Sequence, residues 1–264
     1  MGAGYQWDAA AYARHAGAQY EWASELIDRL GLAGDEALLD IGCGDGRVTA
    51  LLAQRLRAGR IVGVDRSFAM ARATRRSYAA GYPNLGVIQM DAARLGLAAA
   101  FDVAFSNAVL HWLADHLAVL HGVRRALRPG GRLLFQMGGQ GNVAEVLAAI
   151  NRVAARPRWR GYFAQMPPAY FFYHPDDYRR WAAEAGLRLL DARLVAKALR
   201  QMGVAGMAGW LRSTWLPYVE RVPAALRDRF ATEAAEAYVA GHPADAAGVV
   251  HVAMVRLEVE ARRP

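Results

Sequence analysis

The fold of this chain is decided by the stretch Leu38-Leu39-Asp40-Ile41-Gly42-Cys43-Gly44-Asp45-Gly46. A short apolar run ends in three glycines at alternate positions, and a helical pattern begins at Arg47. The stretch predicts a strand, a tight turn and a helix N-terminus. Glycine lets the main chain turn sharply and lets a ligand approach it, and a helix N-terminus presents unpaired N–H groups with a partial positive charge. We therefore expect the turn to hold a nucleotide-like cofactor that bears an anionic group.

The glycine spacing narrows the kind of cofactor. A dinucleotide-binding turn has its third glycine three residues after the second, whereas here Gly46 follows Gly44 by two residues and Arg47 holds the fingerprint position. Asp40 and Asp45 make the loop acidic. Carboxylates suit a ligand with an ammonium or a sulfonium better than a pyrophosphate. An ordinary glycine-rich turn between a strand and a helix remains the alternative from this segment alone.

A second strand is predicted over residues 60–65, and it ends in an acid, Asp65. A carboxylate at this place can accept hydrogen bonds from both hydroxyls of a ribose. Ser67 follows as a predicted N-cap, which opens a helix through Met70. The order strand, acid, capped helix repeats the organisation of the first segment.

Three further strands are predicted downstream. Residues 85–90 form the third, which is closed by Asp91 and Ala92, and residues 101–106 form the fourth. The fifth strand, residues 132–137, follows a Pro-Gly-Gly turn at the end of a helix.

These five signatures together resemble the class I S-adenosylmethionine-dependent methyltransferases, whose first motif, E/D-x-G-x-G-x-G, is matched by Asp40 to Gly46. The resemblance covers residues 35–137. It implies an α/β fold: a Rossmann-like, seven-stranded, mostly parallel sheet with helices on both faces and a helical lid. It also implies S-adenosyl-L-methionine as cofactor, with S-adenosyl-L-homocysteine as product. The cofactor-binding positions it implies are Asp40, Gly42, Cys43, Gly44, Asp65, Arg66, Met70, Asp91, Ala92, Asn107 and Ala108.

Length and composition are consistent with this class. A chain of 264 residues is long enough for one domain with insertions. No apolar stretch approaches the ~18 residues of a spanning helix, and the N-terminal residues lack the pattern of a signal peptide. The one cysteine, Cys43, excludes an internal disulfide. We expect a cytoplasmic protein without a membrane partner.

The net charge of +8 comes mainly from arginine. Its short clusters, such as residues 72–76 and 156–160, fall on predicted outer helix faces. The first interpretation is that these clusters are solvated helix surfaces. The second is that they attract small anionic substrates, and the least favoured is that they bind nucleic acid.

The whole chain is expected to form a single domain. Its predicted parts are an N-terminal helical cap (1–34), the cofactor-binding core (35–137), helical lid insertions (138–182 and 203–242) and the last strands (187–199 and 249–260). Asn142 is expected to cap the first lid helix. Arg256, Glu258 and Glu260 alternate in the last strand, so they are expected to point outward.

The chemistry is expected directly after the fourth strand, at His111 and Trp112. His111 is either a general base or a histidine that is hydrogen-bonded near the cofactor. Trp112 either donates its indole N–H to a substrate oxygen or fills the pocket wall. A carboxylate acceptor needs no base, because it is ionised at pH 7, whereas a hydroxyl acceptor needs one.

Residues 106–112 resemble the trans-aconitate and juvenile-hormone-acid types of carboxyl methyltransferase. In the second type, a glutamine of the N-terminal helix and a tryptophan after the fourth strand hold the carboxylate, and Gln19 and Trp112 match them here. Arg212, between two tryptophans of the lid, is the expected anion-recognition residue. A structural acid such as Glu220 is the alternative partner for this arginine.

The sequence thus predicts methylation of a small molecule, with an organic-acid carboxylate first and O-, N- or C-methylation of a natural product second. Nucleic-acid methylation is less favoured, because residues 106–109 lack the D/N/S-P-P-Y/F pattern and Cys43 lies in the wrong place for a catalytic cysteine. A non-catalytic cofactor-binding protein stays open. We expect no metal site, and a monomer or homodimer.

Overall fold

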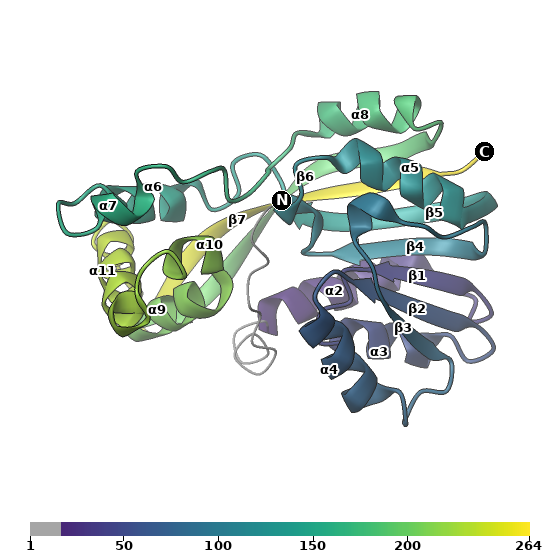
Figure 1. The fold of residues 1–264 in the computed structure, drawn as a ribbon, viewed down its shortest axis with the longest axis horizontal. Coiled ribbons are helices and arrows are strands. Elements are labelled where there is room, and N and C mark those ends of the chain that lie inside the picture. Colours follow the sequence, from purple (N-terminus) through teal and green to yellow (C-terminus); the bar gives the residue numbers. More distant parts are fainter. Residues whose placement is uncertain (1–16) are drawn as a thin grey trace. The chain divides into compact units, whose positions relative to one another are not determined.

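The computed structural model describes residues 17–264 (Figure 1). The described residues form two compact units. The first, called the sheet unit, contains residues 17–140, 170–195 and 256–264. The second, called the helical unit, contains residues 141–169 and 196–255. The chain passes between the units within two long strands and at residues 140–141 and 169–170.

The described part of the chain contains a seven-stranded sheet of order β3-β2-β1-β4-β5-β7-β6. Neighbouring strands from β3 to β5 run parallel, whereas β7 pairs antiparallel with β5. The bounds are β1 Ala37–Ile41, β2 Arg60–Asp65, β3 Leu85–Gln89, β4 Phe101–Asn107, β5 Leu127–Gly138, β6 Arg188–Met202 and β7 Val249–Arg262. The predicted fold class, a Rossmann-like and mostly parallel sheet, is confirmed.

Helices cover both faces of the sheet, and each face has its own apolar core. Leu38 and Phe105 point to one face and pack with Leu26 and Leu52 of helices α2 and α3. Leu39, on the opposite face, belongs to the core that includes residues of α5 and α8. The helices of this unit are α2 Gly17–Leu30, α3 Arg47–Arg55, α4 Phe68–Tyr78, α5 His116–Ala126 and α8 Pro175–Glu184, with short 3-10 turns η1 Ala92–Arg94 and η2 Leu110–Trp112.

The helical unit is built around α11, which packs against both α6 and α9. Its interior is aromatic: Trp159 lies edge-on against Phe230, and Trp210 lies edge-on against Trp215. The helices are α6 Ala144–Ala154, α7 Arg160–Phe163, α9 Gly203–Thr214, α10 Leu216–Val219 and α11 Arg227–Val239, with the 3-10 turn η3 Ala224–Leu226. Whether this unit acts as a lid stays a prediction.

Helix α6 begins differently from the expectation. Its N-cap is Val143, with a left-handed φ of 51°, and not Asn142. The Asn142 side chain is buried and its Oδ1 accepts a hydrogen bond from the N–H of Val255 at 3.0 Å. The amide therefore joins the start of α6 to β7, so it is not available to cap the helix.

The outward alternation expected in the last strand is wrong for two of its three residues. Arg256 and Glu258 are buried, and Glu260 is half-buried. The reason is that β7 lies inside the sheet, between β5 and β6, and α2 contributes Trp22 and Arg29 to that side. The strand is therefore buried continuously over residues 256–259, although its earlier residues His251 and Ala253 are exposed.

Glu258 organises a polar cluster on this side of β7. It accepts hydrogen bonds from Gln136 on β5 at 3.0 Å and from Arg193 on β6 at 3.0 and 3.2 Å, and it pairs with Arg29 on α2. Burial raises the pKa of the Glu258 carboxyl, but the hydrogen bond from Gln136 and the positive charge of Arg29 outweigh it and hold the pKa below its ordinary value. Through these contacts, Glu258 connects β5, β6 and α2 to β7.

Residues 170–182, expected within a lid insertion, belong to the sheet unit instead. Helix α8 packs on α5, and its Tyr178 is fully buried in the core of that face. The arginine clusters at residues 72–76 and 156–160 lie exposed, as expected. Among the described residues, none of the helices is both long and apolar enough to span a bilayer.

Candidate active site

The glycine-rich turn after β1 is held by main-chain hydrogen bonds. The N–H groups of Gly42 and Cys43 both donate to the carbonyl of Val64 on β2, at 2.7 and 3.0 Å. Gly42 has a φ of 77°, and a Cβ at this position would lie 2.2 Å from the Val109 side chain. Gly42 is thus required both by the backbone conformation and by the close approach of the loop after β4.

Gly44 differs, because a Cβ placed on it would meet no atom within 4 Å, although its φ is 55°. Its N–H donates to Oδ2 of Asp65 at 3.0 Å, and Oδ1 of Asp65 accepts from the N–H of Ser67 at 2.8 Å. Burial raises the pKa of Asp65 above its ordinary value, although the two backbone hydrogen bonds act to lower it. The turn and the acid at the end of β2 therefore form one unit, with an open side at Gly44.

Asp40 and Cys43 lie behind the turn. Asp40 is 2% exposed and accepts a hydrogen bond from the Thr49 hydroxyl at 2.6 Å. Burial raises its pKa to about 7, and the negative charge of Asp65 adds to this effect. The Cys43 thiol is buried against the backbone position of Gly63, and burial raises its pKa far above the ordinary value. Asp40 is a hydrogen-bond acceptor beneath the turn, and the thiol has a packing role.

The other predicted cofactor positions lie along the same edge of the sheet, because β3, β2, β1 and β4 are parallel neighbours. Arg66 is exposed, and Met70 is buried in the first turn of α4. Asp91 caps η1 by accepting from the N–H of Ala93 at 2.9 Å, and Ala92 is buried. The ends of four strands thus bring the predicted positions to one edge.

The loop after β4 begins with a strained residue. Ala108 has a φ of 60°, in the left-handed region, and its N–H donates to the carbonyl of Gln136 at 2.8 Å. An alanine in this conformation is held there by its surroundings. The strain turns the chain directly after Asn107, so that Val109 reaches Gly42 and η2 follows with His111 and Trp112.

His111 is positioned as a neutral hydrogen-bond donor. Its Nδ1 accepts from the N–H of Gly138 at 3.3 Å, so the proton of the neutral ring is on Nε2. Burial lowers the pKa of His111 well below 6.5, and the positive charge of Arg256 adds to the effect. A histidine of this tautomer donates from Nε2 and does not take up a proton there, which disfavours the general-base interpretation.

Aromatic side chains form a wall around His111. Its ring centroid lies 5.5 Å from that of Trp112, 6.3 Å from Tyr170 and 6.0 Å from Phe172. Tyr170 and Phe172 stack at 5.6 Å with nearly parallel planes. Their segment is joined to η2 by the Phe171 N–H, which donates to the carbonyl of His111 at 2.9 Å. Sequence reasoning placed this segment in a lid and overlooked Phe172.

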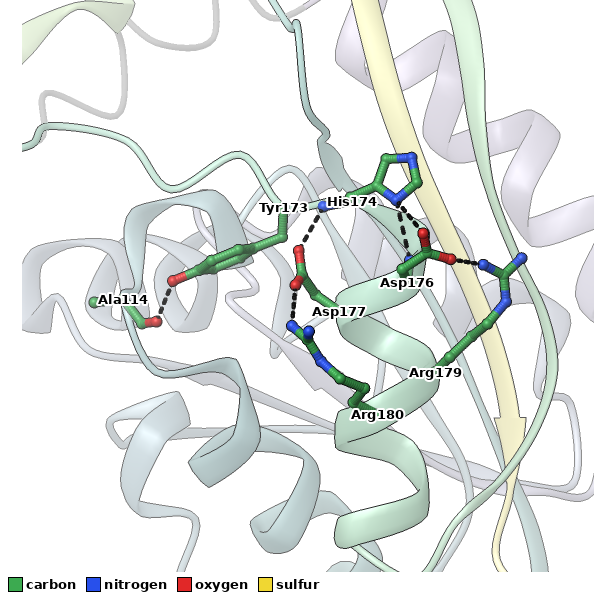
Figure 2. A network of polar contacts seen from close by, with 7 residues as sticks. All are labelled: Ala114, Tyr173, His174, Asp176, Asp177, Arg179 and Arg180. Atoms are coloured by element: carbon green, nitrogen blue, oxygen red, sulfur yellow. Dashed lines mark hydrogen bonds and ion pairs between the residues drawn. The ribbon is translucent and has the colours of Figure 1, made fainter.

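The next residues anchor this wall, as Figure 2 shows. The Tyr173 hydroxyl donates to the carbonyl of Ala114 at 2.6 Å. His174 caps α8: its Nδ1 accepts from the N–H of Asp176, and its own N–H donates to Asp177 at 2.9 Å. In the first turns of α8, Arg179 pairs with Asp176 and Arg180 pairs with Asp177. The aromatic segment is therefore fixed at both ends.

Gln19 and Arg212 are the other two residues expected to bind the acceptor. Gln19 lies in α2, but its side chain is outside the described residues. Arg212 belongs to the helical unit and is exposed, with 41% of its side chain accessible. On α9, Trp210 and Leu211 are buried, whereas Arg212 is exposed. Its partner is an acid, Asp228, at 3.5 Å.

Comparison with known proteins identifies the family to which this chain belongs. A family model described as a methyltransferase domain matches residues 39–135. The chain is 31% identical to a trans-aconitate 2-methyltransferase of Methylobacterium nodulans over 97% of this chain and 98% of that protein. It belongs to the class I S-adenosylmethionine-dependent methyltransferases. The methyltransferase is also 36% identical to an uncharacterized methyltransferase of Schizosaccharomyces pombe, over 69% of this chain and 71% of that one.

Solved structures agree on the fold. Two structures of the geranyl diphosphate C-methyltransferase of Streptomyces coelicolor, both in complex with S-adenosyl-L-homocysteine, match 92% of this chain at 18% identity. Their TM-scores are 0.55 and 0.56, and the match covers 80% and 76% of those chains. The cofactor of the methyltransferase is S-adenosyl-L-methionine. The chain fits this group: the Gly44 position is open on one side, and the half-buried carboxylate of Asp65 stands beside it. When bound, the cofactor supplies an electrophilic methyl group on a sulfonium.

Proposed function

We propose that this methyltransferase methylates the carboxylate of a small organic acid and forms a methyl ester. One observation carries the proposal: His111 accepts a hydrogen bond from Gly138 at Nδ1 and is therefore a neutral donor at Nε2. An acceptor that needed a base would find none in this histidine, whereas a carboxylate is already ionised at pH 7. The similarity to trans-aconitate 2-methyltransferases supports the same acceptor class.

In this proposal, each residue near the end of β4 has a simple task. The Nε2–H of His111 and the indole N–H of Trp112 donate to carboxylate oxygens and orient one of them for in-line attack on the methyl carbon. The stacked rings of Tyr170 and Phe172 exclude water from that position. Orientation of this kind accounts for a large part of the rate enhancement, up to roughly 7–11 kcal/mol of the barrier. No proton moves, because the attacking oxygen carries none.

The direct test is a product screen with the purified chain and S-adenosyl-L-methionine. Trans-aconitate and other di- and tricarboxylic acids are offered beside phenols, alcohols and amines, and mass spectrometry detects the gain of one methyl group. An ester is recognised by its hydrolysis in mild alkali. We expect methyl esters of one or more acids. Products only from phenols, alcohols or amines would contradict the proposal and favour methylation of a natural product.

The pH profile is a second test. Because burial lowers the pKa of His111, the ring stays neutral and kcat should be flat from about pH 6 to pH 9. His111→Gln keeps an N–H donor and should retain substantial activity, whereas His111→Ala removes the donor and should lose about 10- to 100-fold in kcat. A rate that rises with a histidine-like pKa, together with an inactive His111→Gln, would make His111 a base and the acceptor a hydroxyl.

A further inference from the structure

His116 is a buried histidine that the proposed reaction does not use. It is the first residue of α5, and its residue is 1% exposed. Its ring centroid lies 4.7 Å from that of Tyr173, 5.7 Å from Tyr178 and 5.8 Å from Trp181. Burying a polar ring among apolar groups costs free energy unless its nitrogens find partners. The partners of the two ring nitrogens therefore indicate what this histidine does.

Both ring nitrogens of His116 have a hydrogen-bond partner. Nε2 lies 2.7 Å from the carbonyl oxygen of Leu110, and Nδ1 lies 2.7 Å from the hydroxyl oxygen of Tyr178. A carbonyl oxygen only accepts, so Nε2 carries a proton. Burial lowers the pKa of His116 to about 4, so the ring is neutral at pH 7 and Nδ1 accepts from the Tyr178 hydroxyl. The direction of both hydrogen bonds is thereby fixed.

Tyr178 holds His116 from helix α8. Its side chain is fully buried, and its hydroxyl oxygen also lies 3.2 Å from the sulfur of Met137 on β5. A hydroxyl has a single proton, and a thioether sulfur is a weak acceptor compared with an imidazole nitrogen. The proton therefore points to His116. The tyrosine thus keeps Nδ1 occupied, so that the N–H of the ring stays on the side of Leu110.

The carbonyl that accepts from His116 lies at the start of the turn that carries the expected catalytic residues. Leu110, His111 and Trp112 form η2, and the Leu110 carbonyl belongs to the planar peptide group that joins Leu110 to His111. It also accepts from the N–H of Leu113 at 2.9 Å. Leu113 follows in the same loop and moves with it, whereas His116 lies in the core. Of these two donors, only His116 ties the peptide group to a buried helix end.

Two other contacts hold His111, but they act on different atoms. The N–H of Gly138 donates to its Nδ1 at 3.3 Å, and the N–H of Phe171 donates to its carbonyl at 2.9 Å. The first orients the ring, and the second holds the peptide group that follows His111. The peptide group that precedes it depends on the 2.7 Å contact from His116. The backbone on both sides of His111 is therefore fixed, and each side has its own donor.

We propose that His116 and Tyr178 are positioning residues for methyl transfer, which hold the backbone before His111 and thereby place the His111 and Trp112 donors at the acceptor. The proposal rests on the proposed function. A misplacement of about 1 Å in a reacting group can cost roughly 100-fold in rate, even when the altered residue is far from the chemistry. In this role, neither residue contacts the acceptor or transfers a proton. Their loss should therefore lower kcat and leave cofactor affinity unchanged.

The kinetic test uses trans-aconitate as the acceptor. Tyr178→Phe should lower kcat by roughly 10-fold and His116→Leu by roughly 100-fold, whereas the Kd of S-adenosyl-L-methionine should stay within about threefold. His116→Gln should retain more activity than His116→Leu, because its amide carries a donor and an acceptor. The matched control is Tyr238→Phe, which removes a hydroxyl that donates to the His251 carbonyl at 3.1 Å in the helical unit, and it should keep the wild-type kcat.

Urea unfolding of each variant sets the temperature at which it is folded during the assay. A wild-type kcat in folded Tyr178→Phe and His116→Gln would overturn the proposal and leave the pair a role in stability alone. An equal loss of kcat in Tyr238→Phe would also overturn it, because the effect would then not depend on η2. Tyr178→Phe keeps the volume of the ring, so it decides the question even if His116→Leu does not fold.

A measurement without turnover separates this proposal from the proposed function. NMR of the protein with 15N-labelled histidine reports the tautomer of His116 and the ring signals of His111, which are assigned from their loss in His111→Gln. The His116 proton should be on Nε2, and Tyr178→Phe should shift the His111 signals, whereas Tyr238→Phe should not. If no ester forms in the screen but Tyr178→Phe shifts these signals, the positioning role stands and the reaction assignment fails. If ester forms and Tyr178→Phe changes neither kcat nor the His111 signals, the positioning role fails and the reaction assignment stands.

Discussion

The turn after β1 and the wall after β4 lie at the same edge of one sheet, but they are built in different ways. The turn uses main-chain N–H groups and carbonyls of neighbouring strands, and its key side chain, Asp65, is held by two backbone N–H groups. The wall consists of side chains from two separate segments of the chain: His111 and Trp112 of η2, and Tyr170 and Phe172 before α8. A common cofactor is met by backbone geometry, which tolerates few substitutions. In the proposed function, the methyl acceptor is bound by side chains, which substitution can change without loss of the fold.

The strongest test of this difference between the turn and the wall is to add one methyl group to the turn. Gly42→Ala places a Cβ 2.2 Å from Val109 at a φ of 77°, so overpacking and backbone strain add, and stability should fall by roughly 4 kcal/mol or more. Gly44→Ala is the matched control, because its Cβ meets no atom and only strain of about 1 kcal/mol applies. Urea unfolding measures both. Equal stability of the two variants would show that the loop after β4 moves aside freely.

Asp40 offers a test through pH. Burial raises its pKa from 3.8 to about 7, so the folded state keeps a proton between pH 4 and pH 7 that the unfolded chain has lost. The free energy of unfolding should therefore fall as pH rises through this window, by up to roughly 4 kcal/mol, and stay level above it. Asp40→Asn removes this contribution, so the variant should match the wild type near pH 4 and exceed it at pH 8. Parallel pH profiles of the two proteins would contradict the assignment.

The smallest of these effects concerns cofactor affinity alone. Asp65→Ala removes the carboxylate that stands beside Gly44, and the Kd of S-adenosyl-L-methionine should rise by the equivalent of ~2–3 kcal/mol. Asp45→Asn, in the same loop but paired with Arg47, is the control and should change affinity by less than ~0.5 kcal/mol. Calorimetry at one pH and salt concentration measures both. Unchanged affinity in Asp65→Ala would remove this residue from the site.

The sequence predicted those features whose determinants are close together in the chain. Helix α3 begins at Arg47, and the Ser67 hydroxyl accepts from the N–H of Met70, both as expected. The position of His111 and Trp112 directly after β4 also follows from local order. A strand, a glycine turn and a capping side chain each depend on a few neighbouring residues, so periodicity and residue type suffice to locate them.

The acceptor side depends on pairing between distant segments, which no local pattern encodes. Arg256 was expected to face solvent because alternation in a strand does not reveal that β7 is buried continuously over residues 256–259. Arg212 was favoured because tryptophans flank it in the sequence; the helix buries Trp210 and exposes Arg212, and whether this arginine binds the acceptor stays a prediction. Tyr170 reaches His111 only because residue 171 bonds to the main chain of η2. One signal was available: the three charged residues alternate with Leu257, Val259 and Ala261.

The burial of Cys43 has a practical consequence. It is the one cysteine of the chain, its thiol is packed against Gly63, and burial keeps it protonated. Thiolate is the form that reacts with maleimides, iodoacetamide and disulfides, so the folded protein should be silent toward these reagents. A single cysteine introduced at an exposed position such as Phe68 or Met202 would then carry a spectroscopic label at one defined place, without prior removal of the native thiol.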